Sequence, residues 1–387
     1  MLFRSKGCKC GDYFYKASVC HKADAHDSWF VECDNAGRYA LEANLMYCEL
    51  VLPALLWPDD PARFISAAPA LANLLARGTS TSAPSNSLEN WLLDRFSLTT
   101  GGAAISLLGE NAVAPDDDYW LRADPVHLSI NRDRVVLLDA SQLDIGADEA
   151  KQLCNSLNEH FHGDGLSFIA PNPQRWYVKC ATGHPLQTHP LSVVRGRRID
   201  KFGFSGPGRG LWEGRLSEAQ MLLHAHPVNE AREERDALAI NSLWLWGGGH
   251  LPAAPTSPIQ RIVANEGLPR GLAKLSGAEF LHNDQDVNWQ VASHSTNSML
   301  VVTDGLAVPA AYGDTDSWLS QLQAVEATWF APALAALKQG KLKKSTLTIL
   351  QSKATLTTAI GRADLFKFWR GKETLSNQLR AFHDQDH

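Results

Sequence analysis

The stretch NSLWLWGGG, residues 241–249, places a short apolar run directly before three glycines. An apolar run of this length, bounded by polar residues and glycines, is typical of a buried β-strand, so we expect a strand over 242–246 and a tight turn after it. Apolar runs of the same kind occur at residues 50–57, 298–303 and 346–350. The sequence therefore predicts several buried strands that are far apart along the chain.

Segments with apolar residues at helical spacing lie between these runs. We expect helices over residues 67–77, 318–337 and 363–382. A loop rich in serine and threonine is expected over 78–87. Strands that alternate with helices are typical of an α/β protein with an open sheet. The fold class predicted for most of the chain is therefore α/β.

The middle of the chain has a different pattern. Residues 126–130 and 134–139 alternate around a short polar turn and predict a β-hairpin. An amphipathic helix is expected over 147–161, followed by strands over 166–170 and 175–180. This order predicts a compact α+β unit inserted in the larger α/β sheet.

We therefore expect three parts. Residues 1–45 lack sustained apolar periodicity and are an N-terminal appendage. Residues 46–115 and 216–387 form the α/β core, and residues 116–215 form the inserted α+β domain. A glycine-rich stretch, 203–214, is the expected hinge between the two.

Composition limits the classes of function. The chain has 387 residues, of which 44% are hydrophobic and 20% charged, as in ordinary globular proteins. Its net charge of −6 gives no basic field for nucleic acid or an anionic membrane. The apolar runs are much shorter than the ~20 residues that span a bilayer. We expect a cytoplasmic protein with neither nucleic acid nor membrane as a partner, while a protein partner stays open.

Cysteines crowd the start of the chain. Zinc sites use thiolate and imidazole ligands, and residues 1–48 contain seven such side chains: Cys8, Cys10, Cys20, His21, His26, Cys33 and Cys48. However, no C-x₂-C pair is present, so free thiols are the other interpretation. No cofactor is otherwise expected, and the alternative is two divalent metals bound elsewhere in the chain.

Two further patterns suggest ligand sites. The three glycines Gly247, Gly248 and Gly249 could let backbone N–H groups approach an anion, although a simple tight turn is the favoured interpretation. Acidic and histidine side chains in the second half could hold divalent metals such as Mn²⁺ or Mg²⁺, or could be solvated surface residues. The candidate metal ligands are Asp284, Asp286, His294, Asp304 and Asp316.

Several of these segments together resemble a known family. RADPV at 122–126, HPVN at 226–229, NSLWLWGGG at 241–249 and YGDTD at 312–316 are similar to segments of the archaeal-type cofactor-independent phosphoglycerate mutases. The whole pattern also resembles bacterial phosphoglycerate-mutase-like proteins, labelled regulatory proteins of the RpfE type. This resemblance implies an alkaline-phosphatase-like core, two divalent metals and a serine or threonine nucleophile.

The resemblance fails where the chemistry should lie. The position of the family's first metal-binding aspartate corresponds to LPAL at 52–55, and that of its nucleophile to APAL at 68–71. The late aspartate–histidine pair is replaced by QSKA at 351–354, and the acidic ligands expected before residue 325 are missing. Without ligands two metal ions cannot be held.

Two hypotheses follow. In the first, the chain is a catalytically degenerate mutase-like protein that is regulatory or binds a phosphorylated metabolite. The proposed ligand-binding residues are Arg122, Arg175, His226, Asn229, Gly247, Gly248 and Gly249. In the second, the chain is an active metal-dependent phosphoglycerate mutase or phosphatase with relocated ligands.

Overall fold

The computed structural model describes residues 46–55, 66–111, 117–131, 134–181, 185–265, 267–352 and 354–370. Of the possible zinc ligands, Cys48 is described and is a buried free thiol. The expected N-terminal appendage, with the other six possible zinc ligands, lies outside the described residues. So do the end of the first apolar run and most of the expected C-terminal helix.

The first sheet has seven strands in the order β2-β12-β11-β1-β10-β8-β9. Strand β1 lies at its centre and runs parallel to both β10 and β11. Strands β8 and β9 continue the parallel part, whereas β12 and β2 are antiparallel to their neighbours. The bounds are β1 Met46–Pro53, β2 Thr79–Pro84, β8 Arg261–Ala264, β9 Glu279–His282, β10 Ser298–Val302, β11 Leu342–Leu350 and β12 Ala354–Gly361.

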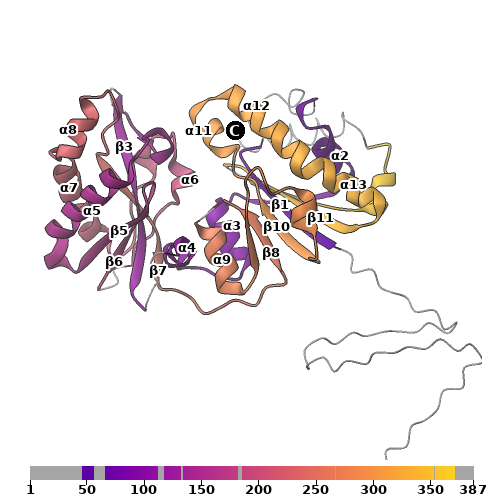
Figure 1. Cartoon of the computed structure of the whole chain (residues 1–387), viewed down its shortest axis with the longest axis horizontal. Helices are drawn as coiled ribbons and strands as arrows, with labels where there is room; N and C mark the ends of the chain where they lie inside the picture. The colour runs from indigo at the N-terminus through magenta and orange to yellow at the C-terminus, as the bar shows by residue number, and fades with distance from the viewer. Residues whose placement is uncertain are drawn as a thin grey trace, which may run out of the picture. The chain divides into compact units, whose positions relative to one another are not determined.

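Helices cover both faces of this sheet (Figure 1). Leu50 and Leu52 of β1 point to one face and pack with α2, α12 and α13, while Val51 points to the other face and packs with α3 and α9. This alternation buries a strand on both sides. The bounds are α2 Pro69–Arg77, α3 Leu88–Arg95, α9 Leu268–Ser276, α12 Thr315–Val325 and α13 Ala331–Gln339, with short helices α10 Trp289–Ser293 and α11 Ala307–Tyr312 and the 3₁₀ turn η5 Arg362–Phe366.

Helix α4, Gly102–Glu110, packs closely against α9. The contact is between backbones, because a Cβ on Gly271 of α9 would overlap the carbonyl oxygen of Ile105 on α4. Gly109 of α4 meets the carbonyl oxygen of Gly267 in the same way. Only glycine permits so close an approach.

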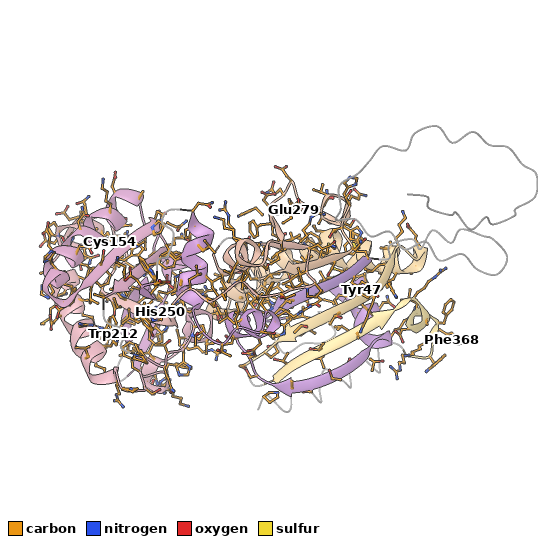
Figure 2. The ribbon with its side chains drawn as sticks, turned by 90° about the horizontal axis from the view of Figure 1, so that it is seen from below. Tyr47, Cys154, Trp212, His250, Glu279 and Phe368 are labelled. Carbon is orange, nitrogen blue, oxygen red and sulfur yellow. The ribbon has the colours of Figure 1, made fainter. Side chains whose placement is uncertain are left out.

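A second sheet of five strands is built around the long strand β3. One edge of β3 pairs with β6 and β4, and the other edge pairs with β7. Helices α5, α7 and α8 cover one face, and Cys154 and Trp212 of this layer are labelled in Figure 2. The bounds are β3 Tyr119–Asn131, β4 Arg134–Leu138, β5 Leu166–Asn172, β6 Arg175–Cys180, β7 Ser242–Gly249, α5 Ala147–Phe161, α6 Leu191–Val194, α7 Arg209–His224 and α8 Pro227–Glu233, with 3₁₀ turns η1 Ala140–Gln142, η2 His162–Asp164 and η3 Ile199–Lys201.

The α/β fold class, with an open sheet and a smaller inserted α+β unit, is confirmed. The insert is larger than predicted, however. The sequence placed residues 216–249 in the core, whereas β7 pairs with β3 in the second sheet and α7 and α8 pack on that sheet. The physical reason is that a short apolar strand fits either sheet, and its sequence does not select its partner.

Three smaller expectations also need correction. The serine- and threonine-rich loop forms β2, which pairs with β12. The expected hinge at 203–214 is partly helical, because α7 begins at Arg209. The long helix over 318–337 is interrupted by a π-helical turn, η4 Glu326–Phe330. Among the described helices, none is both long and apolar enough to span a membrane.

Candidate functional site

A buried arginine–aspartate pair lies on the face of the second sheet opposite to the one that α5 and α7 cover. Arg122 and Asp124 are two residues apart on β3, so their side chains share that face. Nε and Nη2 of Arg122 donate to one carboxylate oxygen of Asp124, and Nε1 of Trp246 donates to the other at 2.6 Å. The guanidinium carbon lies 4.9 Å from the ring centroid of Tyr177 and 5.1 Å from that of Trp246. Burial raises the pKa of Asp124, and Arg122 opposes that shift.

A second pair joins this sheet to helix α4. Nε and Nη2 of Arg175 donate to the two carboxylate oxygens of Glu110 at 2.6 and 3.0 Å, and Tyr177 Oη donates to Glu110 at 3.0 Å. Burial alone would raise the pKa of Glu110, but Arg175 and Tyr177 outweigh it and lower that pKa. Glu110 is therefore a carboxylate that holds the arginine in place.

Both arginines predicted as phosphate ligands thus already have carboxylate partners. Arg122 is almost fully buried with Asp124, and Arg175 is half-buried against Glu110. Two cations and two carboxylates leave this network with no net charge. A phosphorylated ligand would have to displace a carboxylate from its hydrogen bonds, which is unfavourable for a buried pair.

The three glycines are the last residues of β7, so the tight turn predicted there is wrong. Gly247 has φ of 69°, a backbone conformation that favours glycine. A Cβ on Gly248 would overlap the hydroxyl of Tyr119, and one on Gly249 would lie 2.6 Å from the amide nitrogen of Gly101. These glycines let β7 approach the start of α4, and their role in the structure is close packing.

His226 and Asn229 are both occupied within the second sheet's helical layer. His226 caps α8, since its Nδ1 accepts from the Val228 N–H at 3.1 Å, and its Nε2 lies 2.9 Å from Ser156 Oγ. Asn229 donates to the carbonyls of Leu223 and Ile240 and accepts from the Ile240 N–H. Their side chains hold the α7–α8 connection to β7.

The cap at His226 predicts a pH effect. Burial lowers the pKa of His226 below its ordinary 6.5, so the unfolded chain binds the proton more readily than the folded chain. Stability is therefore complete above about pH 6.5 and falls as the pH drops toward the lowered pKa, because a protonated Nδ1 can no longer accept from Val228.

Denaturant unfolding at about pH 7 and about pH 5 measures this effect. His226→Asn keeps a capping acceptor that does not titrate, so the variant is expected to lose less stability on acidification than the wild type. An equal loss in both proteins would exclude a role for His226 in the acid sensitivity.

The five residues of the metal alternative do not come together. Asp284 and Asp286 follow β9, His294 ends α10, Asp304 follows β10, and Asp316 lies in the first turn of α12. Within the described ranges no three His, Cys, Asp or Glu side chains are placed to hold one metal ion. The relocated ligand set is therefore not supported by the geometry.

Asp304 lies shortly after β10, at the carboxyl edge of the first sheet, where open α/β sheets bind ligands. It accepts from the side-chain amide of Asn265, the residue after β8, at 2.6 Å. Burial raises the pKa of Asp304. Thr303 donates its hydroxyl to the carbonyl of Val51, which ties the ends of β10 and β1 together.

A polar contact joins this edge to the insert. The hydroxyl of Tyr312 on α11 donates to Asp139 Oδ1 at 2.8 Å and accepts from the Asp139 N–H at 3.0 Å. Arg195 also donates to Asp139. Tyr312 lies in the YGDTD segment and Asp139 ends a predicted strand, but nothing in the spacing of these residues shows that they meet.

The start of helix α2 carries the most informative contact. Ala68 is its N-cap and offers no side-chain acceptor. Instead the carboxylate of Glu326, from the π-helical turn η4, accepts from the backbone N–H of Ala70 at 2.6 Å and of Leu71 at 3.1 Å. Glu326 is buried, and burial raises its pKa. An internal carboxylate thus fills the position where a helix N-terminus could bind an anion. Sequence reasoning missed Glu326, and the acid inside an apolar stripe was its only signal.

The chain is 22% identical over 309 residues to a 2,3-bisphosphoglycerate-independent phosphoglycerate mutase of Methanosarcina barkeri, covering 74% of this chain and 76% of that protein. The chain is similar to archaeal mutases. The Methanosarcina mazei protein of the same name is 23% identical over 197 residues, covering 48% of this chain and 49% of that protein. No family model matches the chain.

Two solved structures were also found. One is the PH0037 protein from Pyrococcus horikoshii, with a TM-score of 0.47, 14% identity, and coverage of 82% of this chain and 88% of that one. The other is a cofactor-independent phosphoglycerate mutase from Thermoplasma acidophilum, with a TM-score of 0.42, 14% identity, and coverage of 87% and 99%.

Proposed function

We propose that this chain is a catalytically degenerate phosphoglycerate-mutase-like protein that acts by binding, as a regulatory protein. Its similarity to the Methanosarcina mutases supports the mutase-like part. The alkaline-phosphatase-like core and the kinship with bacterial regulatory proteins of the RpfE type, expected from the sequence motifs, belong to the same proposal.

The observation that carries this proposal is the start of α2. In the resembling family the nucleophile precedes this helix. Here the corresponding residue is Ala68, which has no hydroxyl. The Glu326 carboxylate already accepts from the amides of Ala70 and Leu71. A phosphoryl group at that position would have neither an attacking oxygen nor free helix N–H groups, and it would meet the electrostatic repulsion of a carboxylate.

A separate observation favours the regulatory interpretation over the metabolite-binding one. The arginines that would recognise a phosphate, Arg122 and Arg175, each bond to a carboxylate of this chain. An isolated arginine fork attracts phosphate strongly, whereas a fork with a carboxylate partner has lost most of that attraction.

Turnover of 3-phosphoglycerate in the presence of Mn²⁺ tests the loss of catalysis. We expect no 2-phosphoglycerate above the enzyme-free rate, while the Methanosarcina barkeri mutase serves as the positive control. Ala68→Ser supplies a hydroxyl and is expected to stay inactive because Glu326 still occupies the helix start. Mass spectrometry of the purified protein for bound metal accompanies the assay. Two bound ions together with turnover would overturn the proposal and favour the active metal-dependent enzyme.

Calorimetric titration with 3-phosphoglycerate separates the two binding hypotheses. We expect no saturable heat. Saturable binding that Arg175→Ala weakens at least about tenfold, with unfolding still cooperative, would instead identify a metabolite-binding protein.

A further inference from the structure

Strand β2 is an open edge of the first sheet. It pairs with β12 on one side, and no described strand pairs with the other. All six of its residues, Thr79–Pro84, are exposed, so no described element buries either of its faces. The strand carries hydroxyls and no charge. Natural edge strands are commonly protected by charges, by bulges or by a covering helix. Strand β2 has no charged residue, and no described helix covers it.

An aromatic segment lies at the start of this strand. Phe366, Phe368 and Trp369 are 72%, 80% and 68% exposed, and Figure 2 shows Phe368 pointing away from the ribbon. Two hydrogen bonds fix the segment there: Arg370 donates to the carbonyl of Gly78 at 3.1 Å, and Arg77 donates to the carbonyl of Leu365 at 2.9 Å. Three large aromatic side chains together on a surface are typical of a contact site for another molecule.

The same segment is basic. Residues 362–370 contain Arg362, Lys367 and Arg370 but one carboxylate, Asp364, and Arg77 adds a fourth cation. Asp364 bonds to Lys367 at 2.6 Å. The two arginines that fix the segment donate to neutral carbonyls, and Asp364 also interacts electrostatically with Arg370. The chain as a whole is acidic, with a net charge of −6, so this basic surface is a local exception.

We propose that β2 and residues 362–370 form a docking surface for an extended, acidic segment of another protein. An unpaired strand edge presents alternating N–H and C=O groups, which another extended polypeptide backbone matches and a nucleic acid or a lipid does not. Acidic side chains on the added strand fit Arg77 and Arg370, which lie beside the start of β2, and its apolar side chains fit the aromatic segment. This inference is independent of the proposed loss of catalysis.

Fluorescence anisotropy with two labelled eight-residue peptides tests the surface. One alternates valine with glutamate, and the other alternates valine with lysine. The glutamate peptide is expected to bind the full chain at least about tenfold more tightly than the lysine peptide, and Arg370→Glu is expected to reduce its binding about tenfold. Ile130→Ser is the control. It removes from the second sheet an apolar side chain about as exposed as Phe368, and it should leave binding unchanged.

The backbone part is tested by two proline variants, Thr81→Pro and Ser82→Pro. Neighbouring residues of a strand point their N–H groups to opposite edges, so one variant removes a bond to β12 and the other removes a donor of the open edge. The variant that keeps its unfolding midpoint is the one that lacks only an open-edge donor. It is expected to lose its binding of the glutamate peptide.

Three results would overturn the proposal. The first is equal affinity for both peptides. The second is a dimer that the fold-retaining proline variant dissociates, which would assign the edge to a second copy of this chain. The third is binding of a single-stranded oligonucleotide or an anionic phosphatidylserine vesicle that depends on Trp369, with no binding of the glutamate peptide.

Discussion

Replacing Asp124 by alanine is expected to lower the free energy of unfolding by about 3–5 kcal/mol. The change would leave the buried Arg122 guanidinium without its carboxylate and Trp246 Nε1 without its acceptor. The two aromatic rings beside the guanidinium attract a cation but cannot replace a full negative charge. Urea unfolding followed by circular dichroism measures the loss.

Two controls separate the buried charge from a general effect of substitution. Glu213→Ala removes the partner of Arg209 in an exposed pair on α7 and is expected to cost less than about 0.5 kcal/mol. The double variant Arg122→Met with Asp124→Leu removes both charges and should recover most of the stability lost by Asp124→Ala. If the double variant were as unstable as the single one, lost packing rather than the uncompensated charge would be responsible.

Gly271→Ala is expected to destabilise the chain by about 3 kcal/mol or more. The new methyl group would overlap the carbonyl oxygen of Ile105, which belongs to the backbone of α4 and cannot rotate away. The two helices would have to separate, and the tight α4–α9 contact would be lost. Thermal unfolding monitored by calorimetry provides the measurement.

Gly214→Ala is the matched control for that variant. Gly214 also lies inside a helix, α7, but no atom lies within 4 Å of a Cβ placed on it. This substitution is expected to stabilise the chain by about 0.5–1 kcal/mol, because alanine loses less conformational freedom in a helix. Opposite shifts of the unfolding temperature are the predicted signature of the pair, and equal shifts would contradict it.

The sequence predicted the individual helices and strands better than it predicted how they are arranged in the two sheets. The amphipathic spacing of residues 147–161 predicted α5 with the bounds that the structure has, and the hairpin of β3 and β4 was predicted within a few residues. Strand β7 was also predicted, but in the wrong sheet. Periodicity depends on neighbours along the chain, whereas the choice between two sheets depends on residues more than a hundred positions away.

The same limit explains the candidate site. Arg122 and Arg175 were predicted as ligand-binding residues from the sequence, but their carboxylate partners Asp124 and Glu110 decide what they can bind. Aspartate two residues away on a strand is a detectable signal, since the two side chains share a face. Glu110 on α4 is 65 residues from its partner Arg175 on β6, and Glu326 is more than 250 residues from its partners on α2. Neither pairing has a local signal.

The insertion also sets the order in which the chain can fold during synthesis. All strands of the second sheet, from β3 to β7, leave the ribosome as one continuous segment, so this unit can close while the rest is still being made. Strand β1 has to wait for β10 and β11, which are translated only after the whole second sheet. Until then its apolar residues lack their partners, so we expect β1 to be prone to aggregation while the chain is being made.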